Sequence, residues 1–180
     1  WNGEKLTNPI LIKELPAFDT THFGGVIATG LNNEIYFTLG DLDRQGIFQN
    51  AISSNDTIVT GVIFKIDTEE NNKVEIVAMG IRNSFGLALD PITGYLWDTE
   101  NGPDNYDEIN LVESGFNSGW KIVMGPIDRN YLETDTSQII SQYKMQGDCK
   151  KKAYDLQDFY DCVNKPFENF VYSDPEFSWQ

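Results

Sequence analysis

The sequence predicts an all-β protein, made of several blades of a β-propeller, on three observations. Short apolar segments separated by turn residues run along the 180-residue chain, while helical periodicity is hard to find. Two hairpin-like segments repeat in register with each other. The composition, 40% hydrophobic and 13% aromatic, is that of a globular chain rather than a disordered one.

The expected strands are short and each ends at turn residues. In chain order they are 26–28, 35–38, 61–67, 74–79, 87–89, 96–99 and 108–112. Pro91 and Gly94 supply turn chemistry between two of these strands, which indicates a β-hairpin.

The repeat sets the architecture. Gly25 aligns with Gly86, 61 residues further on. The expected strands 35–38 and 96–99 each begin ten residues after the corresponding glycine. This period exceeds the roughly 40–50 residues of common propeller blades, so loop insertions must account for the difference. Four-stranded blades around an axis are the simplest architecture for the pattern. The alternative is a β-sandwich, which does not require such a repeat.

The same alignment gives the only histidine, His22, a defined place. His22 lies three residues before Gly25, as Asn83 lies three residues before Gly86. Both would enter the innermost strand of successive blades from the same end, so His22 and Arg82–Asn83 should converge at the mouth of the central channel. An imidazole can remove a proton near neutral pH, especially when an acid fixes its tautomer, and Asp41 is the candidate acid. The alternative is a structural or merely exposed histidine.

Charge and composition exclude some classes of partner. The formal net charge of −15 and the pI near 4.2 argue against nucleic acid, which is bound by basic stripes. No apolar run reaches the roughly 18 residues that span a membrane. Such acidity indicates either solubility or calcium affinity. Residues 102–108 are dense in hard oxygen donors, and form either a calcium-binding loop or a solvated acidic turn.

Four further features concern compartment and extent. Cys149 and Cys162 have a spacing that could close a disulfide, and residues 55–57 form a glycosylation sequon. Both favour an extracellular or periplasm-like location, and whether the cysteines are bonded stays open. We interpret residues 130–170 as an exposed insertion within a domain that covers 1–180. Because the chain begins with Trp1, we expect a fragment of a longer protein.

Six ordered motifs carry a family resemblance. They are HFGG at 22–25, YFTLGD at 36–41, GIRNSFGLAL at 80–89, TENGP at 99–103, DEINL at 107–111 and GFNSGW at 115–120. Together, over about residues 17–124, they resemble the glucose/sorbosone dehydrogenase family, the soluble quinoprotein sugar dehydrogenases. The resemblance implies about three blades of a six-bladed β-propeller, with residues 172–179 as the start of another blade.

The resemblance also implies roles for the residues at the channel mouth. His22 would be the general base that takes the proton from the anomeric hydroxyl of an aldose, while hydride passes to pyrroloquinoline quinone (PQQ). Asp41 would orient His22 and stabilise its charge. Arg82 and Asn83 would contact the quinone from the channel wall. An external electron acceptor would then reoxidise the cofactor.

Calcium sites are implied in the acidic segment. The carbonyls of Gly102 and Pro103 would hold the Ca²⁺ that polarises the quinone. Asp107 and Glu108 would belong to a second, structural calcium site.

The chain departs from the family pattern at several places. Phe85 stands where the family usually has glutamine, Ser118 replaces a common tyrosine near the second calcium, and Thr21 replaces an acid beside the histidine. The basic residues that clamp the quinone from later blades have no counterpart in these 180 residues.

The leading hypothesis is therefore an extracytoplasmic PQQ-dependent aldose dehydrogenase, with this part of it inactive by itself because the channel is incomplete. The alternative is a non-catalytic propeller that binds carbohydrate or protein through the same face, because fold does not guarantee chemistry. A hydrolase or lactonase on a calcium propeller is a third class. The sequence does not name the sugar, the electron acceptor or the oligomeric state.

Overall fold

The computed structural model describes residues 3–17, 21–42, 60–103, 106–120, 124–125 and 171–179, and the regular secondary structure among them is all β-strand. The strands are β1 (Ile27–Thr29), β2 (Ile35–Leu39), β3 (Val62–Asp67), β4 (Lys73–Met79), β5 (Ser84–Leu89), β6 (Leu96–Glu100), β7 (Asp107–Val112), β8 (Phe116–Asn117), β9 (Val171–Tyr172) and β10 (Phe177–Trp179). The all-β prediction is confirmed.

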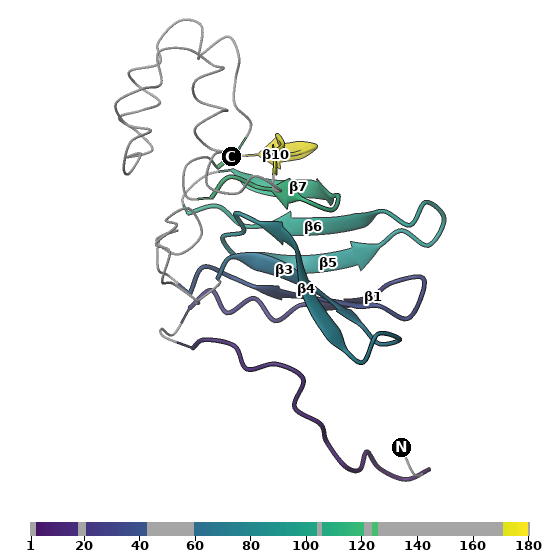
Figure 1. The fold of residues 1–180 in the computed structure, drawn as a ribbon. Coiled ribbons are helices and arrows are strands. Elements are labelled where there is room, and N and C mark those ends of the chain that lie inside the picture. Colours follow the sequence, from purple (N-terminus) through teal and green to yellow (C-terminus); the bar gives the residue numbers. More distant parts are fainter. Residues whose placement is uncertain are drawn as a thin grey trace, which may run out of the picture.

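The described strands form two sheets (Figure 1). The first has the order β1-β2-β3-β4-β8-β9, in which β1 to β4 form an antiparallel meander while β8 and β9 add in parallel. The second is antiparallel, with the order β5-β6-β7-β10. Each sheet thus begins with one of the two repeated hairpins, so the internal repeat corresponds to successive blades.

The C-terminal strand differs from its expected place. Residues 172–179 were expected to start another blade, but Phe177–Trp179 pairs with β7 and completes the second sheet. The Glu176 amide also donates to the Ile109 carbonyl at 3.1 Å. Without β10, the outer edge of β7 would present unpaired backbone groups. Sequence pattern alone cannot separate a strand that closes one blade from a strand that opens the next.

The hairpin turns use the residues that tight turns require. Between β5 and β6, the Asp90 carboxylate accepts from the Ile92 amide at 2.9 Å and the Thr93 hydroxyl at 2.6 Å. Gly94 follows with φ of 77°, a conformation that glycine adopts without steric cost. This is the hairpin that Pro91 and Gly94 predicted.

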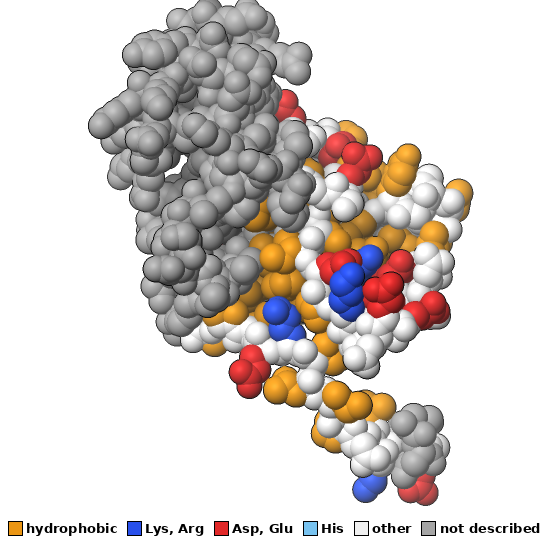
Figure 2. Space-filling view, viewed as in Figure 1, with side chains coloured by type: hydrophobic (Ala, Val, Ile, Leu, Met, Phe, Trp, Pro, Cys, Tyr) orange, Lys and Arg blue, Asp and Glu red, His pale blue; other side chains and the backbone are white. Residues whose placement is uncertain are grey.

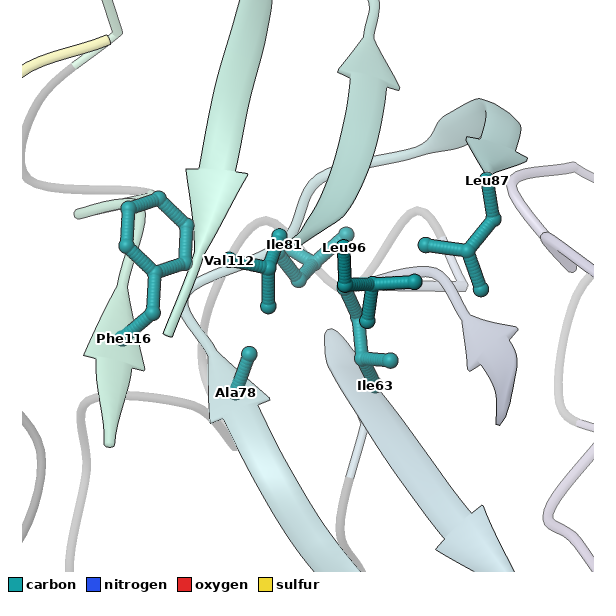
Figure 3. Close-up of a cluster of buried hydrophobic side chains, with 7 residues drawn as sticks. All are labelled: Ile63, Ala78, Ile81, Leu87, Leu96, Val112 and Phe116. Carbon is teal, nitrogen blue, oxygen red and sulfur yellow. The ribbon is translucent and has the colours of Figure 1, made fainter. Parts of the chain in front are cut away.

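Buried side chains from both sheets pack against one another (Figure 3). The cluster consists of Ile63, Ala78, Ile81, Leu87, Leu96, Val112 and Phe116. A second cluster, Leu39, Leu42, Val62, Phe64 and Met79, involves the neighbouring residues of β3. Strand β3 is therefore buried on both faces, which explains its continuous apolar run.

Three chain segments are held together beside the ends of strands β2, β3 and β4. The Gly61 amide donates to the Gly40 carbonyl at 2.8 Å, and the Ile81 amide donates to the Gly61 carbonyl at 3.0 Å. The Asp41 amide donates to the Arg82 carbonyl at 2.8 Å. These bonds join the segment that follows β2 to the segment that precedes β5.

On the face drawn in Figure 2, one group of basic side chains stands among acidic ones. Lys73 lies 2.6 Å from Glu75 and 3.6 Å from Glu70, and Lys65 lies 3.5 Å from Glu75. The charge of these lysines is therefore largely neutralised by neighbours. In the part of the chain that the structure describes, no helix is long and apolar enough to cross a membrane.

Candidate active site

His22 and Asp41 form a hydrogen-bonded pair. The Nδ1 atom of His22 lies 2.7 Å from Oδ1 of Asp41, and the two side chains are 17% and 1% exposed. Asp41 lies two residues after the end of β2, whereas His22 precedes β1 and has φ of 55°. Because an ionised carboxylate only accepts, the pair places the proton on Nδ1 and leaves Nε2 to accept one.

Gly40 makes this close approach possible. A Cβ atom at position 40 would lie 2.1 Å from the His22 carbonyl oxygen and 2.9 Å from the Arg82 carbonyl oxygen. Both neighbours are backbone atoms, so they cannot move aside as a flexible side chain would. Only glycine at this position lets the chain segments of His22, Asp41 and Arg82 meet.

The second carboxylate oxygen of Asp41 is also bonded. Trp120 donates its Nε1–H to Asp41 Oδ2 at 2.7 Å, although the two residues are 79 positions apart. The guanidinium carbon of Arg82 lies 5.4 Å from the centroid of the Trp120 ring. Trp120 thus contacts both Asp41 and Arg82.

Arg82 and Asn83 lie where the chain enters β5. The backbone amide of Arg82 donates to the Glu100 carboxylate, and its Nη1 donates to the Asn101 carbonyl at 2.9 Å. The buried Nε of Arg82 has no hydrogen-bond partner among the described residues. Asn83 donates from Nδ2 to Asn101 Oδ1 at 2.9 Å. A largely buried cation and an amide therefore stand beside the His22–Asp41 pair.

The residues of the expected calcium sites lie between β6 and β7 and at the start of β7. The Gly102 amide donates to Asp107 Oδ1 at 3.0 Å, and Pro103 is exposed. Exposure alternates along β7, so the half-buried Asp107 and the fully buried Glu108 project from opposite faces. Consecutive residues of a strand alternate in direction, so these two side chains diverge. Among the described residues, no group of three His, Cys, Asp or Glu is arranged to hold a metal ion.

Comparison with known proteins decides the family. The sequence profile of the family described as glucose/sorbosone dehydrogenase matches residues 4–178. The chain belongs to the glucose/sorbosone dehydrogenase family. The resemblance drawn from the six motifs is confirmed, and it extends beyond the residues 17–124 that carry those motifs.

Relatives with curated names include sugar dehydrogenases. The chain is 33% identical over 124 residues to an aldose sugar dehydrogenase of Escherichia coli (strain K12), which covers 62% of this chain and 32% of the relative. It is 31% identical over 147 residues to quinoprotein glucose dehydrogenase B of Acinetobacter calcoaceticus, covering 68% of this chain and 30% of the relative. The chain therefore spans about a third of the length of these family members.

Solved structures of the family share the fold. The structure of a putative oxidoreductase (glucose dehydrogenase) from Thermus thermophilus superposes with a TM-score of 0.53 at 30% identity, covering 64% of this chain and 37% of that one. The PQQ-bound aldose sugar dehydrogenase of Streptomyces coelicolor superposes with a TM-score of 0.51 at 26% identity. That superposition covers 62% of this chain and 34% of the Streptomyces chain. This member of the family is thus about a third of a sugar dehydrogenase propeller, and the prediction of a partial β-propeller is confirmed.

A layer of buried acids lies beside the candidate site of this family member. Asp98, Glu100 and Glu108 are at most 2% exposed. Burial raises the pKa of all three, and the negative charge of Glu108 adds to the increase for Asp98 and Glu100. The pKa of Asp98 rises to about 7. Both carboxyl oxygens of Asp98 lack a hydrogen-bond partner among the described residues.

Two departures from the family pattern have structural consequences. Ser118, which stands where the family commonly has tyrosine, places its hydroxyl 3.0 Å from Glu100 and 3.1 Å from Glu108. One hydroxyl hydrogen can serve only one of these carboxyls, which agrees with a protonated acid in the pair. Phe85, which stands in place of glutamine, is 72% exposed and lines an open cavity of about 320 Å³ together with Trp179.

Sequence reasoning overlooked three features. Asp98 and Glu100 follow Leu96 at intervals of two residues, and this period did place two acids on the buried face of β6. Trp120 gave no such signal, because its contact with Asp41 depends on the tertiary fold. Asn101 was passed over although it bonds both Arg82 and Asn83. Cys149, Cys162, the sequon 55–57 and the expected insertion 130–170 lie outside the described residues.

Proposed function

We propose that this chain is the histidine-bearing part of a PQQ-dependent dehydrogenase that oxidises the anomeric hydroxyl of aldoses. Family membership supports the class of reaction. The observation that carries the proposal is the bond between His22 Nδ1 and Asp41 Oδ1 at 2.7 Å, beside Arg82. A histidine with its tautomer fixed by a buried acid is a suitable general base near neutral pH.

The chain's own residues would handle the proton. Nε2 of His22 takes the proton from the anomeric hydroxyl of the sugar, and the ionised Asp41 stabilises the imidazolium that results. When bound, PQQ supplies the two-electron acceptor for the hydride that leaves the anomeric carbon. The sugar loses one proton and one hydride, which leaves a lactone.

The residues beside the pair fit such a cofactor. Arg82 presents a buried Nε–H without a hydrogen-bond partner among the described residues, which suits an acidic, oxygen-rich ligand. Asn83 uses Nδ2 on Asn101 and keeps its side-chain oxygen as an acceptor. Arg82 and Asn83 would therefore hold one side of the quinone, and an external acceptor would take its electrons.

Calcium belongs to the proposal as well. The carbonyl oxygens of Gly102 and Pro103 are hard ligands of the kind Ca²⁺ prefers, and the bond from the Gly102 amide to Asp107 fixes that turn. Ca²⁺ there would polarise the quinone. Asp107 and Glu108 would belong to a second, structural calcium site, where Glu108 is buried beside the Ser118 hydroxyl.

Reconstitution of the full-length protein tests the proposal. The protein is treated with EGTA, loaded with PQQ and Ca²⁺, and mixed with aldoses and an artificial electron-accepting dye. We expect stoichiometric uptake of quinone and aldose-dependent dye reduction. Aldose binding without uptake of quinone would instead support a non-catalytic carbohydrate-binding propeller. We further propose an extracytoplasmic location, which cell fractionation tests.

A further inference from the structure

Trp120 reaches the candidate base from a different part of the fold. It follows β8, and its indole N–H donates to Oδ2 of Asp41 at 2.7 Å, while Oδ1 of the same carboxylate contacts His22 at 2.7 Å. The two oxygens of one carboxylate therefore have different partners, one on each side.

The indole ring is itself held in place. The backbone amide of Trp120 donates to the Gly80 carbonyl at 3.0 Å, which anchors the residue to the segment that leads to Arg82. The Arg82 guanidinium carbon lies 5.4 Å from the ring centroid, a distance at which cation and π-system attract each other. A ring fixed by its backbone and one face presents its N–H in a defined direction.

We propose that Trp120 is a positioning residue for the His22–Asp41 pair and links it mechanically to Arg82. The catalytic consequence rests on the proposed function, but the structural claim does not. Asp41 is 1% exposed, so the Trp120 N–H is not readily replaced by bulk water. With both oxygens bonded, the carboxylate does not rotate about its Cβ–Cγ bond, and Oδ1 stays on His22 Nδ1.

Removing the N–H should loosen the base. In Trp120→Phe, Oδ2 of Asp41 loses a donor inside the protein, and the carboxylate turns to recover one. His22 then spends less time in the tautomer whose Nε2 can accept a proton. Misplacement of a reacting group by about 1 Å can lower turnover by roughly 100-fold, so kcat should fall on the order of 10- to 100-fold, with little change in KM.

Two readouts in the full-length protein test the proposal. Protons of ¹⁵N-labelled histidine are observed by NMR, and His22→Gln identifies the His22 signal by its loss. In Trp120→Phe we expect the far-downfield Nδ1–H signal of His22 to shift upfield or to vanish through exchange with water, along with the fall in kcat. Trp97→Phe is the matched control, because Trp97 lies on β6 away from the pair. A Trp120→Phe spectrum and kcat equal to those of Trp97→Phe would overturn the proposal.

A gentler replacement separates the N–H from the shape of the ring. 3-Benzothienylalanine at position 120 keeps the ring shape and replaces the N–H with sulfur, so it should reproduce the effects of Trp120→Phe even if the phenylalanine variant folds poorly. In an Asp41→Asn background, loss of the Trp120 N–H should cost no further kcat, because Trp120 acts through Asp41. A wild-type protein that never oxidises aldoses would refute the proposed function, whereas the NMR comparison would still decide the role of Trp120.

Discussion

His22 has a backbone φ of 55°, in the left-handed region that few residues other than glycine adopt. Such conformations cost of order 1–3 kcal/mol and persist where surrounding contacts enforce them. Here the enforcing contacts are the bond to Asp41 and the close approach of the His22 carbonyl to Gly40. The strain is thus located at the residue proposed to act as the base.

Gly40→Ala should therefore displace the backbone of His22. The new methyl group would fall 2.1 Å from the His22 carbonyl oxygen, and overpacking of this kind costs about 1–3 kcal/mol or more. Urea unfolding of the full-length protein should show the loss, together with a lower kcat. Gly86→Ala is the control, because its closest neighbour is the movable hydroxyl of Thr99 at 2.7 Å. Equal stabilities for the two variants would contradict the steric account.

At the scale of the strand, β6 carries its acids on the face that packs inward. Leu96, Asp98 and Glu100 share that face, and Asp98 lies opposite Asn110 on β7. Burial, together with the charge of Glu108, raises the pKa of Asp98 from 3.8 to about 7. Between these pH values the folded state binds more protons at Asp98 than the unfolded state does. The contribution of Asp98 to the free energy of unfolding is therefore fully present below about pH 4 and declines as pH rises toward 7.

Asp98→Asn should remove part of this pH dependence. The amide keeps the shape of the carboxyl, cannot ionise, and offers N–H donors to Oδ1 of Asn110, which has no hydrogen-bond partner among the described residues. We expect the variant to lose less stability than the wild type between about pH 5 and about pH 8, and to be more stable by about 1–3 kcal/mol at the upper end. Urea unfolding in EGTA across that range measures this. The pKa values of Glu100 and Glu108 are also raised, so the stability of the variant should still fall somewhat with rising pH. The same dependence of stability on pH in the variant and the wild type would contradict a raised pKa for Asp98.

The elements show which features the sequence could predict. The hairpins followed from apolar alternation and turn residues, which are local, and the repeat placed His22 near Arg82 because equivalent positions of successive blades enter from the same end. The place of β10 and the reach of Trp120 depend on contacts between distant segments, which no local pattern encodes.

At the scale of the whole molecule, the chain covers about a third of its relatives and leaves apolar surface open. Phe85 is 72% exposed, Phe177 63% and Trp179 50%, all on the second sheet. Large aromatic side chains exposed together usually mark a contact surface. In a propeller, each blade packs against the next, so such a face fits the side of a blade whose neighbour lies elsewhere in the protein.

The 180 residues expressed alone should therefore behave differently from the full-length protein. We expect light scattering to show self-association, because association buries the exposed aromatic side chains. We expect no quinone-dependent turnover, because the rest of the channel wall is absent. The full-length protein under the same conditions is the comparison. A monodisperse, active monomer of this chain would show that a third of the propeller suffices.

The role of His22 is the central claim, and one comparison tests it most directly. The full-length protein and its His22→Ala variant are loaded with PQQ and Ca²⁺, and quinone binding and aldose-dependent kcat are measured side by side. We predict that the variant binds quinone with an affinity close to that of the wild type and keeps its fold, while kcat falls by roughly 100-fold or more, in line with the loss of a general base. A variant that keeps a near-normal kcat would contradict the account.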